Sequence, residues 1–277
     1  MDARRFLGLE PTADPLLWRL PVTLGVSTPG QFLFGGAGLA AGVAAMEIAT
    51  GRPTIWATAQ YLAYAPTGSV VDFDINLAVV GHQTTQARAI GRVAGKEILA
   101  VNAALGRRQL DVGGTWAQRP DVGGPDACTR RTIPPEFTGT VLERVEMRLA
   151  LGRQFEELDG TPGDGHCAFW ARLPGAESAE PSSAWLSILG DYVPSGVAQA
   201  LGRSSIGNSL DNTIRVVQLV ASEWVLCDIQ MLAIANGFGH GRAHLWAEDG
   251  TLLGIASQSV IVRVGRPPLR RPSVRDA

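Results

Sequence analysis

Two polar side chains in the last quarter of the chain, Asp211 and Gln258, are of the types that hold and activate a water molecule. Asp211 begins an apolar, strand-like run, and Gln258 lies in the last run of this kind. A carboxylate can accept a proton from water, and a carboxamide can orient that water through a hydrogen bond. If both strands belong to one sheet, these side chains are expected to meet and to support hydrolysis without a serine or cysteine nucleophile.

Each of these residues also has an ordinary structural interpretation. An aspartate in front of a strand is commonly a turn or cap residue. Gln258 lies among Ile255, Val260 and Ile261, and the alternation of a strand would also allow it to face solvent. The pairing is therefore a hypothesis that depends on both side chains pointing to the same side of the sheet.

A glycine pair at the start of an apolar helix supplies a second element of such chemistry. Gly35 and Gly36 precede an alanine- and glycine-rich run that is expected to be helical over 36–50. The first amides of a helix have no partner within the helix, so Gly35 and Gly36 are candidate donors to an oxyanion. The alternative is a core helix whose small side chains let a sheet pack closely. No Lys-Ser or Lys-Thr pair follows the glycines, which excludes a P-loop.

The same order of elements occurs twice along the chain. In both halves a helix precedes strand-like runs, and Gly95 or Gly250 marks the turn between the last two runs. The first helix (36–50) is followed by runs at 55–65, 70–80, 84–93 and 98–105, and the second helix (182–201) by runs at 210–220, 224–234, 241–246 and 252–264. This repeat predicts an α+β fold of two units, each a long helix wrapped by a curved antiparallel sheet.

The repeat also predicts the domain organisation. The N-terminal unit is expected at 1–110 and the C-terminal unit at 141–265. Residues 111–140 are rich in glycine and proline and read as a linker. The tail 266–277 contains several prolines and arginines and is expected to be disordered.

The composition excludes several classes of protein. The chain has 277 residues and a net charge of −2, without the basic surplus of nucleic-acid-binding proteins. No signal peptide is visible, and no apolar run reaches the ~20 residues needed to span a bilayer. The three cysteines show no CxxC spacing and are expected to be reduced thiols of a cytoplasmic protein. His240 and His244 lie among glycines that disfavour a helix, so neither a metal nor a cofactor is predicted.

Several short motifs resemble those of the acyl-CoA thioesterase II family, whose bacterial and peroxisomal members are tandem hotdog proteins. The resemblance extends from Phe6 to about Arg263 and depends on the order and spacing of the motifs. The matching motifs are Phe34-Gly35-Gly36, Ser209-Leu210-Asp211, Glu223-Trp224-Val225-Leu226, Glu248-Asp249-Gly250 and Ala256-Ser257-Gln258. The run Leu189-Gly190-Asp191-Tyr192-Val193-Pro194 resembles the broader thioesterase-like group.

The resemblance implies a double hotdog that hydrolyses acyl-CoA thioesters with water held by an Asp, a Thr or Ser, and a Gln. Asp211 falls on the acid position and Gln258 on the carboxamide position. Counting without gaps from Trp224 places the hydroxyl position at Leu232, which cannot form the hydrogen bond. Asn236 and Ser257 are the neighbouring alternatives for that role.

Two functions therefore remain open at the level of sequence. One is a cytoplasmic acyl-CoA thioesterase of fatty acid metabolism, with coenzyme A as part of the substrate and no nucleic acid or membrane span involved. The alternative is a non-catalytic or weakly active acyl-CoA or acyl-carrier binding protein, which Leu232 favours. The first unit has Thr58 and Ala103 where the second has Asp211 and Gln258, so at most one site per chain is expected. Exposed faces of hotdog folds also allow a homo-oligomer.

Overall fold

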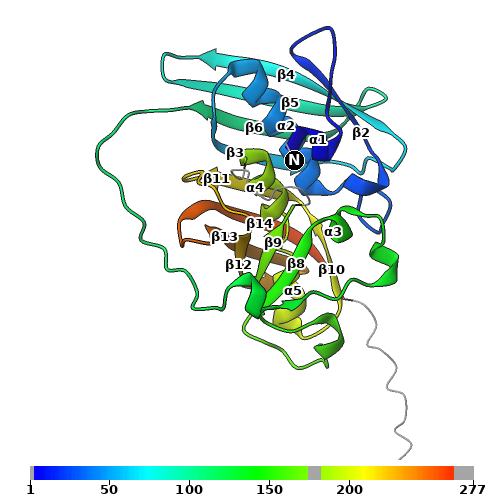
Figure 1. Ribbon diagram of the computed structural model, residues 1–277. Coiled ribbons are helices and arrows are strands. Elements are labelled where there is room, and N and C mark those ends of the chain that lie inside the picture. Colours follow the sequence, from blue (N-terminus) through cyan, green and yellow to red (C-terminus); the bar gives the residue numbers. More distant parts are fainter. Residues whose placement is uncertain (1–2, 174–181, 265–277) are drawn as a thin grey trace, which may run out of the picture.

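The computed structural model describes residues 3–173 and 182–264 of the chain (Figure 1). The expected C-terminal tail, 266–277, lies outside the described residues. Figure 1 shows two helix-and-sheet units, one above the other, with α2 inside the upper unit and α4 near the junction. The long segment that leaves β6 passes along the side of the molecule and connects the two units.

The first unit is built around α2 (Gly35–Thr50), whose residues from Gly36 to Met46 are all buried. Glycines and alanines all round the helix allow neighbouring elements to pack on every side of it. The helix ends at Gly51, which has a left-handed φ of 64° and caps the C-terminus. The strands that wrap α2 are β3 (Thr54–Tyr61), β4 (Val70–Val80), β5 (Thr84–Val93) and β6 (Lys96–Gly106).

The second unit repeats this plan with a broken helix. Its helices are α4 (Ser183–Gly190) and α5 (Ser195–Leu201), and its main strands are β8 (Glu146–Leu151), β9 (His166–Arg172), β11 (Asp211–Val216), β12 (Val225–Ala235), β13 (Phe238–Ala247) and β14 (Leu252–Val264). The single helix expected over 182–201 is therefore wrong. Pro194 cannot donate a backbone hydrogen bond and disfavours helical geometry at Val193, so the chain turns at 191–194 before α5 begins.

Smaller elements complete the described chain. These are α1 (Ala3–Leu7), β1 (Glu10–Pro11), β2 (Leu17–Pro21), β7 (Thr129–Arg130), α3 (Val141–Arg144), β10 (Ser205–Ser209) and the 3-10 turns Leu24–Val26, Pro125–Ala127, Pro135–Phe137 and Phe155–Glu157. The apolar run 141–151 would also allow a single strand, but its first part, Val141–Arg144, is a helical turn. Periodicity over so few residues does not distinguish a turn of helix from a strand.

One antiparallel sheet of 14 strands runs through both units, and β3 and β11 join them. Along this pair the Thr58 and Thr213 hydroxyl groups lie 2.7 Å apart and form a hydrogen bond. Helices α2 and α4 also contact each other across the junction. This architecture confirms the predicted double hotdog, in which one chain carries two helix-and-sheet units side by side.

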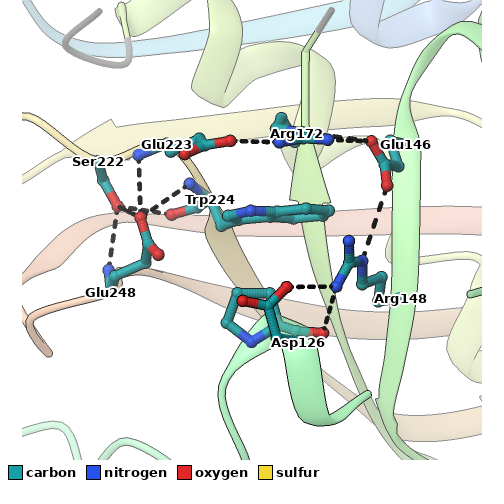
Figure 2. Close-up of polar contacts among 9 residues, drawn as sticks. Asp126, Glu146, Arg148, Arg172, Ser222, Glu223, Trp224 and Glu248 are labelled. Carbon is teal, nitrogen blue, oxygen red and sulfur yellow. Dashed lines mark hydrogen bonds and ion pairs between the residues drawn. The ribbon is translucent and has the colours of Figure 1, made fainter. Parts of the chain in front are cut away.

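The segment between the units is anchored to the outer face of the second sheet. Trp224 lies between the guanidinium groups of Arg148 and Arg172, 4.7 and 4.5 Å from the ring centroid (Figure 2). Arg148 also donates to the Asp126 carboxylate at 2.8 Å, and the Trp170 indole donates to the Gly123 carbonyl at 2.8 Å. These contacts make the linker part of the packed structure from Gly123 onward.

The same cluster explains two of the sequence motifs. Arg172 binds Glu146 and Glu223, and the Glu248 carboxylate accepts the backbone N–H groups of Glu223 and Trp224 at 3.0 and 3.1 Å (Figure 2). The Glu223-Trp224 and Glu248-Asp249-Gly250 motifs therefore stabilise the ends of β12 and β13. All three cysteines are free. Within residues 3–173 and 182–264, the helices are too short or too polar to cross a bilayer.

Candidate active site

The break between α4 and α5 places Asp191 against the N-terminus of α2. The Gly36 N–H donates to Asp191 Oδ2 at 2.5 Å, and the Gln258 amide donates to Oδ1. The Gln258 amide also donates to the Ser209 hydroxyl at 2.6 Å, and that hydroxyl lies 3.4 Å from Asp191 Oδ1. A carboxylate, a hydroxyl and a carboxamide thus converge from the end of α4, from β10 and from β14.

Glycine is required on the α2 side of this cluster because no side chain would fit there. A Cβ atom on Gly36 would lie 2.7 Å from Asp191 Cβ and 2.9 Å from the Ile188 carbonyl oxygen. A Cβ atom on Gly35 would lie 2.9 Å from Asp191 Oδ2 and 3.0 Å from the Tyr61 hydroxyl. All four separations are below ordinary van der Waals contact, so the glycine pair lets the two units meet at the carboxylate.

A cavity of about 730 Å³ opens beside this cluster. Asp191 and Ser209 reach its wall from the second unit, and Gly35 and Tyr61 reach it from the first. Most of the remaining wall is apolar and includes Phe32, Leu33, Phe34, Leu62, Ile98, Leu99, Phe137, Leu142, Phe155 and Ile261. A cavity of this size with few polar groups is typical of a small-molecule site.

The environment of Asp191 is suited to proton transfer. Burial raises the pKa of its carboxyl group to about 7, against the opposing effect of the hydrogen bonds from Gly36, Gln258 and Ser209. A group that titrates near neutral pH can both accept and return a proton during a reaction. Buried acids with strongly shifted pKa values in a cavity are more common at catalytic sites than elsewhere.

Several buried polar atoms around Asp191 have no hydrogen-bond partner among the described residues. They are the Tyr61 hydroxyl, both side-chain polar atoms of Asn212, and Gln258 Oε1. Burial and the charge of Asp191 raise the pKa of Tyr61 well above its usual value, so its hydroxyl keeps its proton and remains a donor. Unpaired buried groups of this kind are expected where a water or a substrate completes the hydrogen bonding.

The predicted partner of Gln258, Asp211, lies on the other face of the sheet. Its Oδ1 accepts the backbone N–H of Ser259 at 2.8 Å. Thr213 pairs with Ser257 in β14, so Asp211 shares the face of Ser257 and not that of Gln258. The predicted Asp211–Gln258 pair is therefore wrong, and the carboxylate that meets Gln258 is Asp191.

One extra residue in the strand explains why the Ser209 hydroxyl and the Asp211 carboxylate face opposite sides of the sheet. Ser209 pairs with Val260, whereas Thr213 pairs with Ser257, so the strand formed by β10 and β11 has one extra residue relative to β14. Such a bulge reverses the alternation of side chains. Ser209 consequently points to Gln258, although it is only two residues from Asp211.

Within the described structure, the Gln258 side chain forms no hydrogen bond with the three residues predicted as alternatives for the hydroxyl position. Leu232 is 60% exposed, and Asn236 has a left-handed φ of 53° at the turn between β12 and β13. Ser257 pairs with Thr213 on the face away from Gln258. The Gly36 N–H donates to the Asp191 carboxylate, so it is not free to bind an oxyanion as predicted. Asp191 and Ser209 both lie within recognised motifs, but the sequence did not show that they converge.

Comparison with known proteins defines the family. A family model described as the acyl-CoA thioesterase C-terminal domain matches residues 125–262. The structure of a candidate thioesterase from Novosphingobium aromaticivorans DSM 12444 is 30% identical, with a TM-score of 0.80, and the match covers 92% of this chain and 98% of that chain. No curated protein matched the sequence. The chain therefore belongs to the acyl-CoA thioesterase II-like family.

More distant structures confirm the fold. A hot dog fold protein of unknown function from Alicyclobacillus acidocaldarius is 18% identical with a TM-score of 0.81, over 95% of this chain and 98% of that chain. A TesB protein from Mycobacterium avium subsp. paratuberculosis is 16% identical with a TM-score of 0.77, over 95% and 98% of the two chains. At these identities the likeness concerns the double-hotdog architecture alone.

Proposed function

We propose that this protein hydrolyses acyl-CoA thioesters to the free acid and coenzyme A, using a water held by Asp191, Ser209 and Gln258. The observation that carries the proposal is the buried Asp191 carboxylate beside an apolar cavity of about 730 Å³. One of its oxygens is bound by the Gly36 N–H and the other by the Gln258 amide. The cavity has room for an acyl chain with its thioester next to this carboxylate.

The reaction needs one proton acceptor and a donor for the developing oxyanion. Asp191 accepts a proton from water, and the water oxygen forms a bond to the thioester carbonyl carbon. The C–S bond then breaks, and Asp191 returns the proton to the coenzyme A thiolate, so that acid and thiol leave. In this proposal the Tyr61 hydroxyl, which has no hydrogen-bond partner among the described residues, donates to the oxyanion.

The site combines elements of both units, so the chain has one such site in this proposal. Thr58, the counterpart of Asp211 in the first unit, bonds to Thr213 at the junction, and Ala103 is buried in the core. The reason for preferring a binding protein without catalysis was Leu232. Leu232 is exposed, and Ser209 has its hydroxyl next to Gln258, which supports hydrolysis over binding alone.

Release of free thiol from a panel of acyl-CoAs tests the proposal directly. The panel should span short, medium and long chains, and acyl groups on a carrier-protein pantetheine should be compared at equal concentration. We expect turnover of at least one acyl-CoA well above the rate without protein. Tight binding of acyl-CoAs with no thiol release would contradict hydrolysis and favour the binding function.

Replacing Ser209 by alanine removes the hydroxyl that Gln258 contacts. We expect kcat to fall about 10-fold, because the water loses one positioning group but keeps its base. Ser257→Ala is the matched control, since Ser257 lies in the same sheet on the opposite face. Equal effects of the two substitutions on kcat would exclude a specific role for Ser209.

The raised pKa of Asp191 predicts a pH dependence of activity. The base must be ionised, so kcat/KM should increase with pH and level off above an apparent pKa of about 7. Measuring kcat/KM from pH 5 to 9 checks this expectation. An ascending limb centred near pH 4 would show that an ordinary, solvated carboxylate is the base.

The same pKa shift predicts that the contribution of Asp191 to the stability of the fold decreases with pH, whereas activity increases. The folded-state pKa lies above the unfolded-state value, so burial of Asp191 disfavours the folded state once the group ionises. Its contribution is most favourable below about pH 4 and is lost as the pH rises through about 7. Urea unfolding of wild type and Asp191→Asn at pH 5 and pH 8 should show the variant gaining relative stability at pH 8.

A further inference from the structure

Two charged groups besides Asp191 line the cavity, Arg131 and the exposed Arg263. Arg131 follows β7 and lies on the cavity wall with Phe137, Leu142 and Phe155. Its guanidinium carbon is 5.0 Å from the Phe155 ring centroid and 6.0 Å from that of Phe169. The Phe169 ring in turn contacts Tyr192, the residue after Asp191, at 5.6 Å between centroids. Arg131 is therefore connected to Tyr192, the neighbour of Asp191, through the Phe169 ring.

The charge of Arg131 has no counter-ion among the described residues. Its side chain donates only to the Met147 sulfur, at 3.1 Å, and thioether sulfur is a weak acceptor. Burial lowers the pKa of Arg131. The two groups whose charge would raise the pKa of Arg131, Tyr192 and Cys167, stay neutral at pH 7, because burial raises both of their pKa values, that of Cys167 to about 12.

The two acids near this part of the chain are already engaged. Glu143 accepts the Gly139 N–H at 2.6 Å, and Glu146 binds Arg172 at 2.6 Å. Neither forms an ion pair with Arg131 in the described part of the chain. A guanidinium that is packed on aromatic rings, and that lacks an acidic partner, retains several unused donors toward the cavity.

We propose that Arg131 binds an anionic group at the far end of the acyl chain, so that the preferred substrates are acyl-CoAs with a terminal carboxylate. The proposal rests on the thioesterase function proposed above. Most of the cavity wall is apolar, as methylene groups require, and the planar guanidinium of Arg131 fits one carboxylate. The other arginine on the cavity wall, Arg263, is exposed near the end of β14 and is the better match for the multiply charged phosphates of coenzyme A.

The test compares dicarboxylyl-CoAs with acyl-CoAs of the same carbon number, such as suberyl-CoA with octanoyl-CoA and adipyl-CoA with hexanoyl-CoA. The measured quantity is the ratio of kcat/KM for each pair. In Arg131→Met we expect this ratio to fall about 10- to 100-fold, the size of a lost charged hydrogen bond. Arg148→Met is the matched control, because Arg148 also stacks on an aromatic ring but on the outer face.

Two outcomes would overturn the proposal. An unchanged ratio of kcat/KM in Arg131→Met would show that Arg131 does not bind the end of the acyl chain. An equal loss of kcat/KM for both members of each pair would show that Arg131 contributes to coenzyme A binding or to folding. Affinities of the same pairs for Asp191→Asn, with and without Arg131→Met, give a readout that needs no turnover. If wild type hydrolyses none of the thioesters, the proposed function fails, while a selective loss of dicarboxylyl-CoA affinity would still support the role of Arg131.

Discussion

Asp191→Asn should lower kcat about 1,000-fold, with a much smaller change in KM. Asparagine has nearly the same shape as aspartate but cannot accept a proton from water. Its side chain can still accept the Gly36 N–H, so the fold at the junction is expected to persist. Thiol release from the best acyl-CoA of the panel measures the effect, and thermal unfolding confirms that the variant is folded.

Asp211→Asn is the control that separates the two carboxylates. Asp211 lies on the outer face and accepts only the Ser259 N–H in the described part of the chain. We expect its substitution to change kcat by less than about threefold. A large loss for Asp211→Asn, with normal activity for Asp191→Asn, would mean that the base is on the outer face and that the site is misassigned.

Gly36→Ala should reduce both activity and stability, since a single methyl group enters the junction between the units. The new Cβ would lie 2.7 Å from Asp191 Cβ and 2.9 Å from the Ile188 carbonyl oxygen, and neither atom belongs to the flexible end of a side chain that could move away cheaply. Overpacking of this kind costs about 1–3 kcal/mol of unfolding free energy. Displacement of the carboxylate by a fraction of an ångström is expected to reduce kcat about 100-fold.

Gly38→Ala serves as the control for the stability effect of Gly36→Ala. A Cβ on Gly38 would approach only the ends of Leu99 and Leu33, at 3.3 and 3.4 Å. Alanine is also the better helix former by about 1 kcal/mol. Urea unfolding should therefore show little change or a gain for Gly38→Ala and a loss for Gly36→Ala. Similar losses of unfolding free energy for both variants would indicate that α2 tolerates no larger residue at either position. The effect at Gly36 would then not be specific to its contact with Asp191.

The sequence was sufficient to predict the repeat of elements and most of the strands. Beta strands β4, β5 and β14 begin and end where the apolar runs predicted, at Val70–Val80, Thr84–Val93 and Leu252–Val264. The helix at Gly35–Thr50 was equally clear, since its glycines and alanines leave few alternatives. These features follow from local periodicity and turn residues, which act within a few positions of the chain.

Which residues meet at the candidate active site was decided by tertiary structure. Gln258 and the glycine pair were predicted from the sequence, and the structure brings them to Asp191 instead of Asp211, because two local irregularities control which side chains meet. Pro194 interrupts the second helix and brings Asp191 to the N-terminus of α2. The bulge between Ser209 and Thr213 turns Asp211 outward and Ser209 inward. A one-residue change of register leaves the hydrophobic pattern of a short strand almost unchanged, yet it exchanges the faces of the sheet.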